Sequence, residues 1–324
     1  EYGRSSGPQV SMVTRSGTNA FRGSAYWFGR RTRTSSNEYF LKLAQAEEGV
    51  NEAPILDKDI FGGSLGGPIV KDRLFFYLNY EQLSEQSERP VTRDVPSGSF
   101  RDGVLMYECA EPARCPGGSV SGLGDTHQVP PGWYGLAPAQ LAALDPLGIG
   151  PNVGLSEYLR QYPLPNEPGN DGANLMGYRF AAPIENTFRT YIARLDARLA
   201  DSHNVFLRVN AQDDAIRDPP QFPGQPPALE TFDRNHGLAA GSDWAISNTL
   251  VNTFRYGFTR IDRDSLGQRA ENATWLRGLS DYTPITFSGA RGTTTHNFVE
   301  QLSWLKGDHA LKAGVNLRFT RLPS

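Results

Sequence analysis

Hydrophobic and polar residues alternate with a period of two along several stretches of the chain. The clearest stretch is ALKAGVNLRFTR (310–321). Its apolar positions are Leu311, Ala313, Val315, Leu317 and Phe319, and its polar positions include Lys312, Asn316 and Arg318. The same alternation occurs in TYIARLDARLA (190–200), NVFLRVNAQDD (204–214) and LVNTFRYGFTR (250–260). A period of two predicts β-strands that each have one apolar face.

Short corners rich in turn-forming residues join these runs in pairs, and long links separate the pairs. The corners are residues 68–72, 201–204, 247–249 and 306–309. The long links are residues 31–54, 84–186, 215–231 and 264–292. Antiparallel barrels of the bacterial outer membrane have short turns on one rim and long loops on the other, and a tilted strand of about ten residues spans their apolar band. The sequence therefore predicts an all-β, antiparallel transmembrane β-barrel.

An aromatic run follows a glycine-rich stretch in GGSLGGPIVKDRLFFYLNYEQ (62–82). One face of the expected strand has Leu74, Phe76, Leu78 and Tyr80, and the other has Phe75, Tyr77, Asn79 and Glu81. We expect the first set to face lipid or to form an aromatic girdle at the membrane interface. The longest link contains two helix-like patterns, APAQLAALDPLG and GLSEYLRQYPLPN, with Pro138 near the first turn of one and Pro163 ending the other.

Composition narrows the possible classes of protein. The 324 residues have a formal net charge of -3 and no cluster of basic residues, which argues against a nucleic-acid partner. No run of about 18 apolar residues occurs, which excludes a transmembrane helix but not a transmembrane barrel. The chain begins at Glu1 without an initiator Met, and we expect it to be a fragment or a trimmed product.

Several stretches resemble sites, but each lacks the pattern that its chemistry needs. Gly62–Gly66 matches the GxSxG motif of hydrolases but leads into a second strand instead of a helix. The glycines of 148–154 have the wrong spacing for a nucleotide, the oxygen-rich stretch 166–172 lacks calcium-loop spacing, and the histidines lie far apart. The five histidines are His127, His203, His236, His296 and His309, and we expect His203 and His309 in turns. We expect no enzymatic activity, no cofactor and no metal.

The two cysteines, Cys109 and Cys115, lie close together in CAEPARC. They match neither a zinc site nor a CxxC redox motif. The sequence leaves two alternatives, a local disulfide formed in an oxidising compartment or two reduced thiols in a loop.

In combination, four stretches resemble the Oar-like family of TonB-dependent outer-membrane receptors. They are EYGRSSGPQVSMVTRSGTNAFRGSAYWFGR (1–30), FGGSLGGPIVKDRLFFYLNYEQL (61–83), YPLPN (162–166) and GDHALKAGVNLRF (307–319). The resemblance covers nearly the whole chain except residues 94–127. It implies a plugged barrel of about 22 strands, of which this chain supplies about nine. Residues 1–19 would then be the C-terminal end of the plug domain, and residues 20–324 the N-terminal part of the barrel, with a long extracellular loop at 84–187.

The resemblance implies energised uptake of a bulky solute across the outer membrane. The expected partners are outer-membrane lipid, an unknown extracellular solute and the TonB complex, which would bind an N-terminal segment outside this sequence. The alternative is a structural, adhesion or secretion-linked barrel without transport. The polar strand faces carry Arg194, Arg198, Arg208, Arg255 and Arg318. These arginines would face the lumen, where they either contact the plug or an anionic solute, or take part in solvation and in cross-strand pairing with residues such as Asp196.

Overall fold

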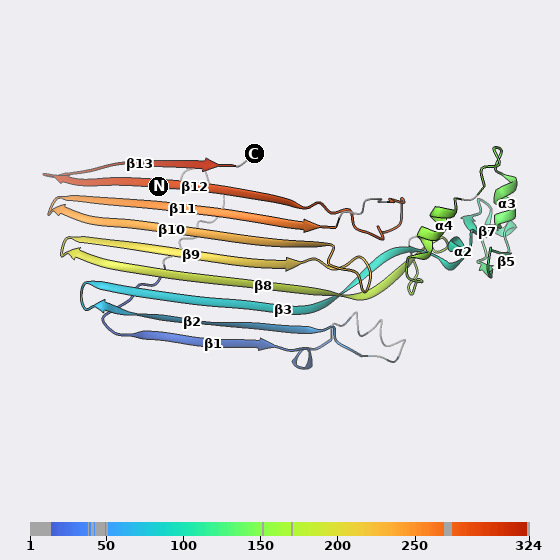
Figure 1. Ribbon diagram of the computed structural model, residues 1–324, viewed down its shortest axis with the longest axis horizontal. Helices are drawn as coiled ribbons and strands as arrows, with labels where there is room; N and C mark the ends of the chain where they lie inside the picture. The colour runs from blue at the N-terminus through green and yellow to red at the C-terminus, as the bar shows by residue number, and fades with distance from the viewer. Residues whose placement is uncertain are drawn as a thin grey trace.

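The computed structural model describes residues 14–37, 39, 42, 49, 51–150, 152–169, 171–268 and 274–322. One antiparallel sheet of nine strands dominates it, and a small cap projects from two of these strands (Figure 1). The sheet strands, in both chain order and spatial order, are β1 (Arg22–Arg30), β2 (Leu56–Val70), β3 (Leu74–Pro96), β8 (Leu175–Ala200), β9 (His203–Arg217), β10 (Leu229–Ser247), β11 (Leu250–Gly267), β12 (Gly289–Lys306) and β13 (His309–Arg321). The predicted all-β, antiparallel architecture is confirmed.

Strand register places the alternating residues on two different faces of the sheet. Leu78 pairs with Ala193, and Ala193 pairs with Val209, so the apolar positions of neighbouring strands lie side by side. Tyr77 pairs with Arg194, and Arg194 pairs with Arg208 on the opposite face. We call these the apolar face and the polar face. A shift of one residue in any pairing would exchange the two sets, so the period of two fixes the register.

Short turns and long links lie at opposite ends of the sheet, as the sequence predicts (Figure 1). In the turn between β2 and β3, Asp72 adopts a φ of 62°, and in the turn between β12 and β13, Gly307 adopts a φ of 59°. Left-handed backbone of this kind is accessible to glycine and, among other residues, to Asp and Asn. His203 and His309 are the first residues of β9 and β13, so the expectation that they lie in the turns themselves is wrong by one position.

Strands β3 and β8 extend well beyond the predicted start of the longest link. They contain 23 and 26 residues and stay paired as far as Pro96 and Leu175, whereas the sequence placed the link at 84–187. Beyond Tyr80 the apolar face of β3 becomes polar at Gln82 and Ser84, so the alternation that predicts a strand is lost. Backbone pairing does not need that alternation, and the two strands continue as a long arm.

The cap comprises residues 97–174 at the end of this arm. It contains α2 (Gly98–Arg101), β4 (Leu105–Glu108), β5 (Gly118–Ser121), β6 (Thr126–Val129), β7 (Trp133–Leu136), α3 (Pro138–Ala143) and α4 (Val153–Arg160). Strand β4 pairs with β7, and β5 pairs with β6. Both predicted helices form, with Pro138 opening α3 and Pro163 following α4. The four short strands were not predicted.

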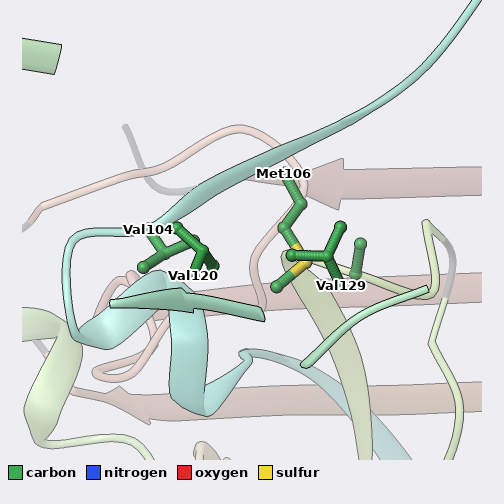
Figure 2. Close-up of a cluster of buried hydrophobic side chains, with 5 residues drawn as sticks. Val104, Met106, Val120 and Val129 are labelled. Atoms are coloured by element: carbon green, nitrogen blue, oxygen red, sulfur yellow. The ribbon is translucent and has the colours of Figure 1, made fainter. Parts of the chain in front are cut away.

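The hydrophobic core of the cap consists of buried side chains from its short strands and the segments beside them. Val104, Met106, Val120 and Val129 converge there (Figure 2). The partly buried Trp133 packs against them. The sheet differs, because its two edge strands, β1 and β13, do not pair with each other and it remains open. The total of about 22 strands stays a prediction. Among the described residues, no helix is long and apolar enough to span a membrane.

Candidate functional site

The apolar face of the sheet carries an exposed band next to the short turns. On β8 the band runs from Leu199 to Tyr191, nine residues that rise roughly 21 Å in a strand tilted near 45°. Its side chains are half exposed, for example 50% for Val315 and 48% for Leu65. Within the described chain, the core residues that are buried all lie between Val95 and Phe222, in or near the cap and the links. The band therefore has no protein core of its own and requires an apolar surrounding.

The polar face is contacted by the segment 14–20, which precedes β1. Arg194 of β8 donates a hydrogen bond to the carbonyl oxygen of Thr14 at 3.1 Å. Arg208, the register partner of Arg194 on β9, donates to Oγ1 of Thr14 at 3.0 Å. The two arginines therefore hold the segment on the polar face rather than on the apolar one.

Glycine allows the segment to approach the sheet closely. Gly17 is buried, and a Cβ atom added there would clash with the backbone oxygens of Gly67 and Phe76. Only glycine fits such an approach between two backbones. Asn19 then closes the contact, because its Oδ1 accepts a hydrogen bond of 2.8 Å from the backbone N–H of Asp72 in the β2–β3 turn.

Phe206 lies between two arginines on the polar face. The guanidinium groups of Arg194 and Arg255 stand 4.7 and 5.4 Å from its ring centroid. Each arginine also pairs with a carboxylate, Arg194 with Asp196 at 2.8 Å and Arg255 with Asp243 at 2.7 Å. The carboxylates offset both positive charges, so the cluster stiffens the wall and offers little free charge to an anion.

The five arginines singled out in the sequence do not form one group. The structure brings Arg194, Arg208 and Arg255 to the surroundings of Phe206 and Thr14. Arg198 lies beside the β8–β9 turn, where its backbone N–H donates to the carbonyl of Arg73. Arg318 is exposed on the edge strand β13. A role of these side chains toward a solute stays a prediction.

An aromatic cluster joins the three links that follow β3, β9 and β11. Tyr162 is 3% exposed and packs edge-on against Phe222 and Tyr282, with ring centroids 5.5 and 5.3 Å away. Its hydroxyl donates a 2.9 Å hydrogen bond to the carbonyl of Ser280. Burial raises the pKa of Tyr162, so the hydroxyl stays neutral and remains a donor. We call these residues, with Tyr158, Tyr178 and Val95, the link cluster.

The sequence analysis missed the link cluster. Its residues are separated by up to about 190 positions, so no local period reveals it. The one local signal is the closeness in sequence of Tyr158, within α4, and Tyr162, two residues beyond its end, whose ring centroids are 5.7 Å apart. Hydrogen bonds from Gln225 to the carbonyl of Tyr282 and from Arg93 to the carbonyl of Gln221 hold the links together further.

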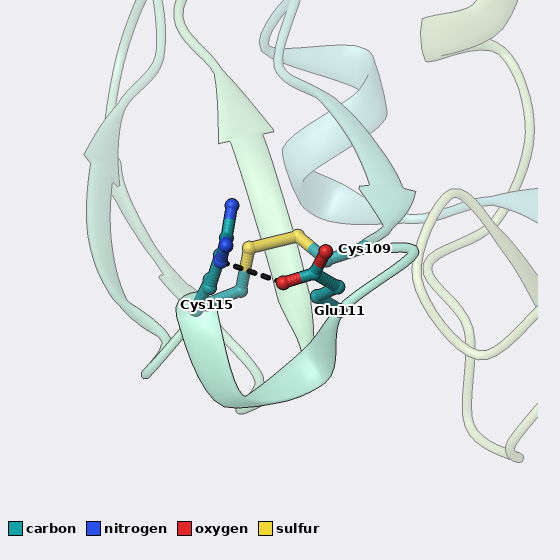
Figure 3. The surroundings of a disulfide bond; sticks show 4 residues. Cys109, Glu111 and Cys115 are labelled. Carbon is teal, nitrogen blue, oxygen red and sulfur yellow. Dashed lines mark ion pairs between the residues drawn. A yellow bond between two sulfur atoms is a disulfide. The ribbon is translucent and has the colours of Figure 1, made fainter.

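Cys109 and Cys115 form a disulfide in the cap (Figure 3). The short loop between them contains a 2.6 Å ion pair of Glu111 with Arg114. Backbone hydrogen bonds to Gly132 flank the bridge on both sides, from Gly132 to Cys115 and from Cys109 to Gly132. The bridge therefore fastens an irregular loop to the start of β7.

The other stretches singled out in the sequence are occupied by structural contacts. Ser64 of the GxSxG match lies within β2, and its hydroxyl is 2.9 Å from that of Ser24 on β1. Glu167 pairs with Arg179 at 2.8 Å, and the Asp171 carboxylate accepts backbone N–H groups of residues 173–175. In the described part of the chain, no group of three or more His, Cys, Asp or Glu residues is placed to hold a metal ion.

Comparison with known proteins gives one family and one relative. The family described as outer membrane beta barrel domain matches residues 13–323. A stretch of 82 residues, 25% of this chain, is 37% identical to the "TonB-dependent transporter Oar" of Myxococcus xanthus. The match spans 7% of the length of that relative. No solved structure matches the chain significantly.

Proposed function

Because the chain belongs to the outer membrane beta barrel domain family, we propose that it forms part of the wall of a TonB-dependent transporter that takes up a bulky solute. The chain is located in the outer membrane, and its exposed apolar band fits the hydrocarbon layer. The 82-residue similarity to a protein named as a TonB-dependent transporter supports the transport role and the Oar-like branch.

The observation that carries the proposal is the contact of segment 14–20 with the polar face. In a transporter of this kind the polar face lines a wet lumen, and the segment is the end of a plug that fills it. The contacts through Thr14 are two hydrogen bonds from arginines, which water can replace when the plug moves. Gly17 and Asn19, close to the β2–β3 turn, keep the end of the segment fixed at the wall.

The links form the proposed extracellular entrance. Short turns lie on the periplasmic rim in barrels of this kind, so the cap and the link cluster lie outside the cell. The link cluster joins three links into one unit, which gives a defined surface for a solute to meet. The proposed function involves no covalent catalysis, no cofactor and no metal. TonB would act through the N-terminal part of the full-length protein.

Deletion of the gene for the full-length protein tests the proposal. A growth and uptake screen over bulky solutes should show a loss for at least one of them, and deletion of TonB should remove the same uptake. The Arg194→Ala/Arg208→Ala double variant should alter this uptake, whereas the control Arg318→Ala should not. If the deletion strain takes up every solute at the parental rate, transport is the wrong function.

A second candidate, an adhesion or structural barrel, is favoured by the surface of the cap. Leu147 and Ile149 are 78% and 79% exposed in the loop between α3 and α4. Carboxylate oxygens of Asp145 accept backbone N–H groups of Leu147 and Gly150, which shapes this loop. Replacing Leu147 and Ile149 by serine should weaken cell adhesion and spare uptake if this candidate is correct.

A further inference from the structure

A groove of about 790 Å³ crosses the apolar face from β1 to β11. Its walls are two rows of side chains from neighbouring strands, and the backbone between the rows forms its floor. Tyr80 and Tyr191, with ring centroids 4.9 Å apart, belong to one row, and Leu78 and Val209 belong to the other. The groove is therefore mostly apolar, with His236 as a polar member of the first row, and it opens toward the hydrocarbon.

Small residues give the groove its width. Ala193 and Ala211 lie on the adjacent strands β8 and β9, where most band positions carry larger side chains. Strands of such barrels tilt near 45°, so a groove that crosses them is also inclined to the membrane normal. A flexible acyl chain can follow that path, whereas a rigid ring system of the same volume would need a rounder cavity.

Arginines lie one outward-facing position above the groove, on the side of the long links. Arg189 precedes Tyr191 on β8, Arg234 precedes His236 on β10, and Arg260 follows Phe258 on β11. Arg234 pairs with Asp264, and Arg260 pairs with Asp262 at 2.7 Å.

Arg189 differs from the other two arginines. It is exposed, and among the described residues it has no ion-pair partner, although Asp213 is its register neighbour. Arg189 lies one outward-facing position beyond the Tyr80–Tyr191 ring pair, on the side of the long links. Aromatic rings of such barrels lie at the membrane interface, so this guanidinium group lies at the level of the lipid phosphates.

We propose that the groove and Arg189 bind one phosphorylated, multiply acylated lipid of the outer leaflet. Arg189 donates to a phosphate group through its planar fork, and one acyl chain lies between the two rows of the groove. The inference rests on the membership of the barrel family and on the long links being extracellular. It does not depend on transport, so the two proposals can fail separately.

Native mass spectrometry of the full-length protein in detergent tests the proposal. The protein is first folded into phosphatidylethanolamine vesicles that contain either bis-phosphorylated lipid A or phosphatidylglycerol. It is then extracted into detergent, and the lipid that it retains is measured. We expect one retained lipid A per chain. Arg189→Gln and Ala211→Phe should each weaken retention roughly tenfold, by loss of a charged hydrogen bond and by filling the groove.

Two controls keep the test specific. Arg318→Gln removes an arginine from the polar face, and Ala313→Phe adds a ring to the apolar face on β13, outside the groove. Both should retain lipid A at the parental level, and all variants should pass a heat-modifiability check of folding. Equal retention of phosphatidylglycerol, or unchanged retention in Arg189→Gln and Ala211→Phe, overturns the proposal.

Discussion

The cap and the band of the sheet bury their apolar residues in opposite ways. In the cap, Val104 and Met106 are 0% and 5% exposed and belong to one buried cluster with Val120 and Val129. In the band, Val315 and Phe319 are 50% and 58% exposed on a regular strand. The cap therefore buries its apolar side chains in a core of its own and can be surrounded by water, whereas the apolar side chains of the band need contact with lipid. The same chain thus buries apolar residues against protein in the cap and against lipid in the sheet, and the arm of β3 and β8 connects the two regions.

The largest effect that separates the two regions should come from a charge in the core of the cap. Val104→Asp places an unpaired carboxylate where no side chain is exposed, at a cost above about 4 kcal/mol. The cap should become sensitive to protease while the barrel keeps its heat-modifiable mobility on gels. Loss of both at once would show that the two regions fold as one unit.

A charge in the band should cost less and should depend on lipid. Val315→Arg, near the middle of β13, is expected to lose about 2–4 kcal/mol of folding free energy in bilayers. Asn316→Lys, its neighbour on the polar face, should be nearly neutral. Equilibrium folding of the full-length protein into lipid vesicles measures both variants. Equal costs at the two positions would remove the distinction between the faces.

Reduction of the disulfide should affect the cap alone. The Cys109–Cys115 bridge closes a short loop, and its loss should cost roughly 2 kcal/mol through the entropy of the unfolded chain. Mass spectrometry of protein taken from the outer membrane should find no free thiol, and Cys109→Ser/Cys115→Ser should speed proteolysis of the cap only. Two free thiols in that protein would contradict the prediction.

The smallest effect should come from the hydroxyl of Tyr162, which joins the cap to a neighbouring link. Tyr162→Phe keeps the ring but removes the hydrogen bond to Ser280, at a cost of about 1 kcal/mol. Amide exchange of residues 274–286 should quicken, with β13 unchanged. Burial raises the pKa of this phenol, so its contribution is complete below the ordinary value near 10 and declines as the pH rises further. If amide exchange of residues 274–286 does not change at high pH, the hydrogen bond of Tyr162 to Ser280 does not stabilise this segment.

The features that the sequence predicted are those with local signals. The apolar and polar sets of β13, the turn at Asp72 and the helix that begins at Pro138 each follow from neighbouring residues. The four strands of the cap escaped prediction because a strand of four residues, such as β5, is too short to show a period. The extension of β3 to Pro96 escaped because its pairing uses polar residues on both faces.

The candidate site was predicted less completely. The polar faces of the strands indicated Arg194 and Arg208, but their contact with Thr14 depends on a segment about 180 residues away. The link cluster depends on rings contributed by three separate links, and no local pattern announces such a meeting. The groove depends on small residues that become neighbours only when the register of β8 and β9 is known.

The most direct test of the central claim is to measure whether each face of one strand contacts lipid or water. A spin label on Val315→Cys and one on Asn316→Cys, in the full-length protein in bilayers, can be compared through collisions with oxygen and with a water-soluble nickel complex. The disulfide leaves no other reactive thiol in this chain. We expect the label at 315 to collide mainly with oxygen, as in hydrocarbon, and the label at 316 mainly with the nickel complex. Equal access of the nickel complex to both labels would contradict the account.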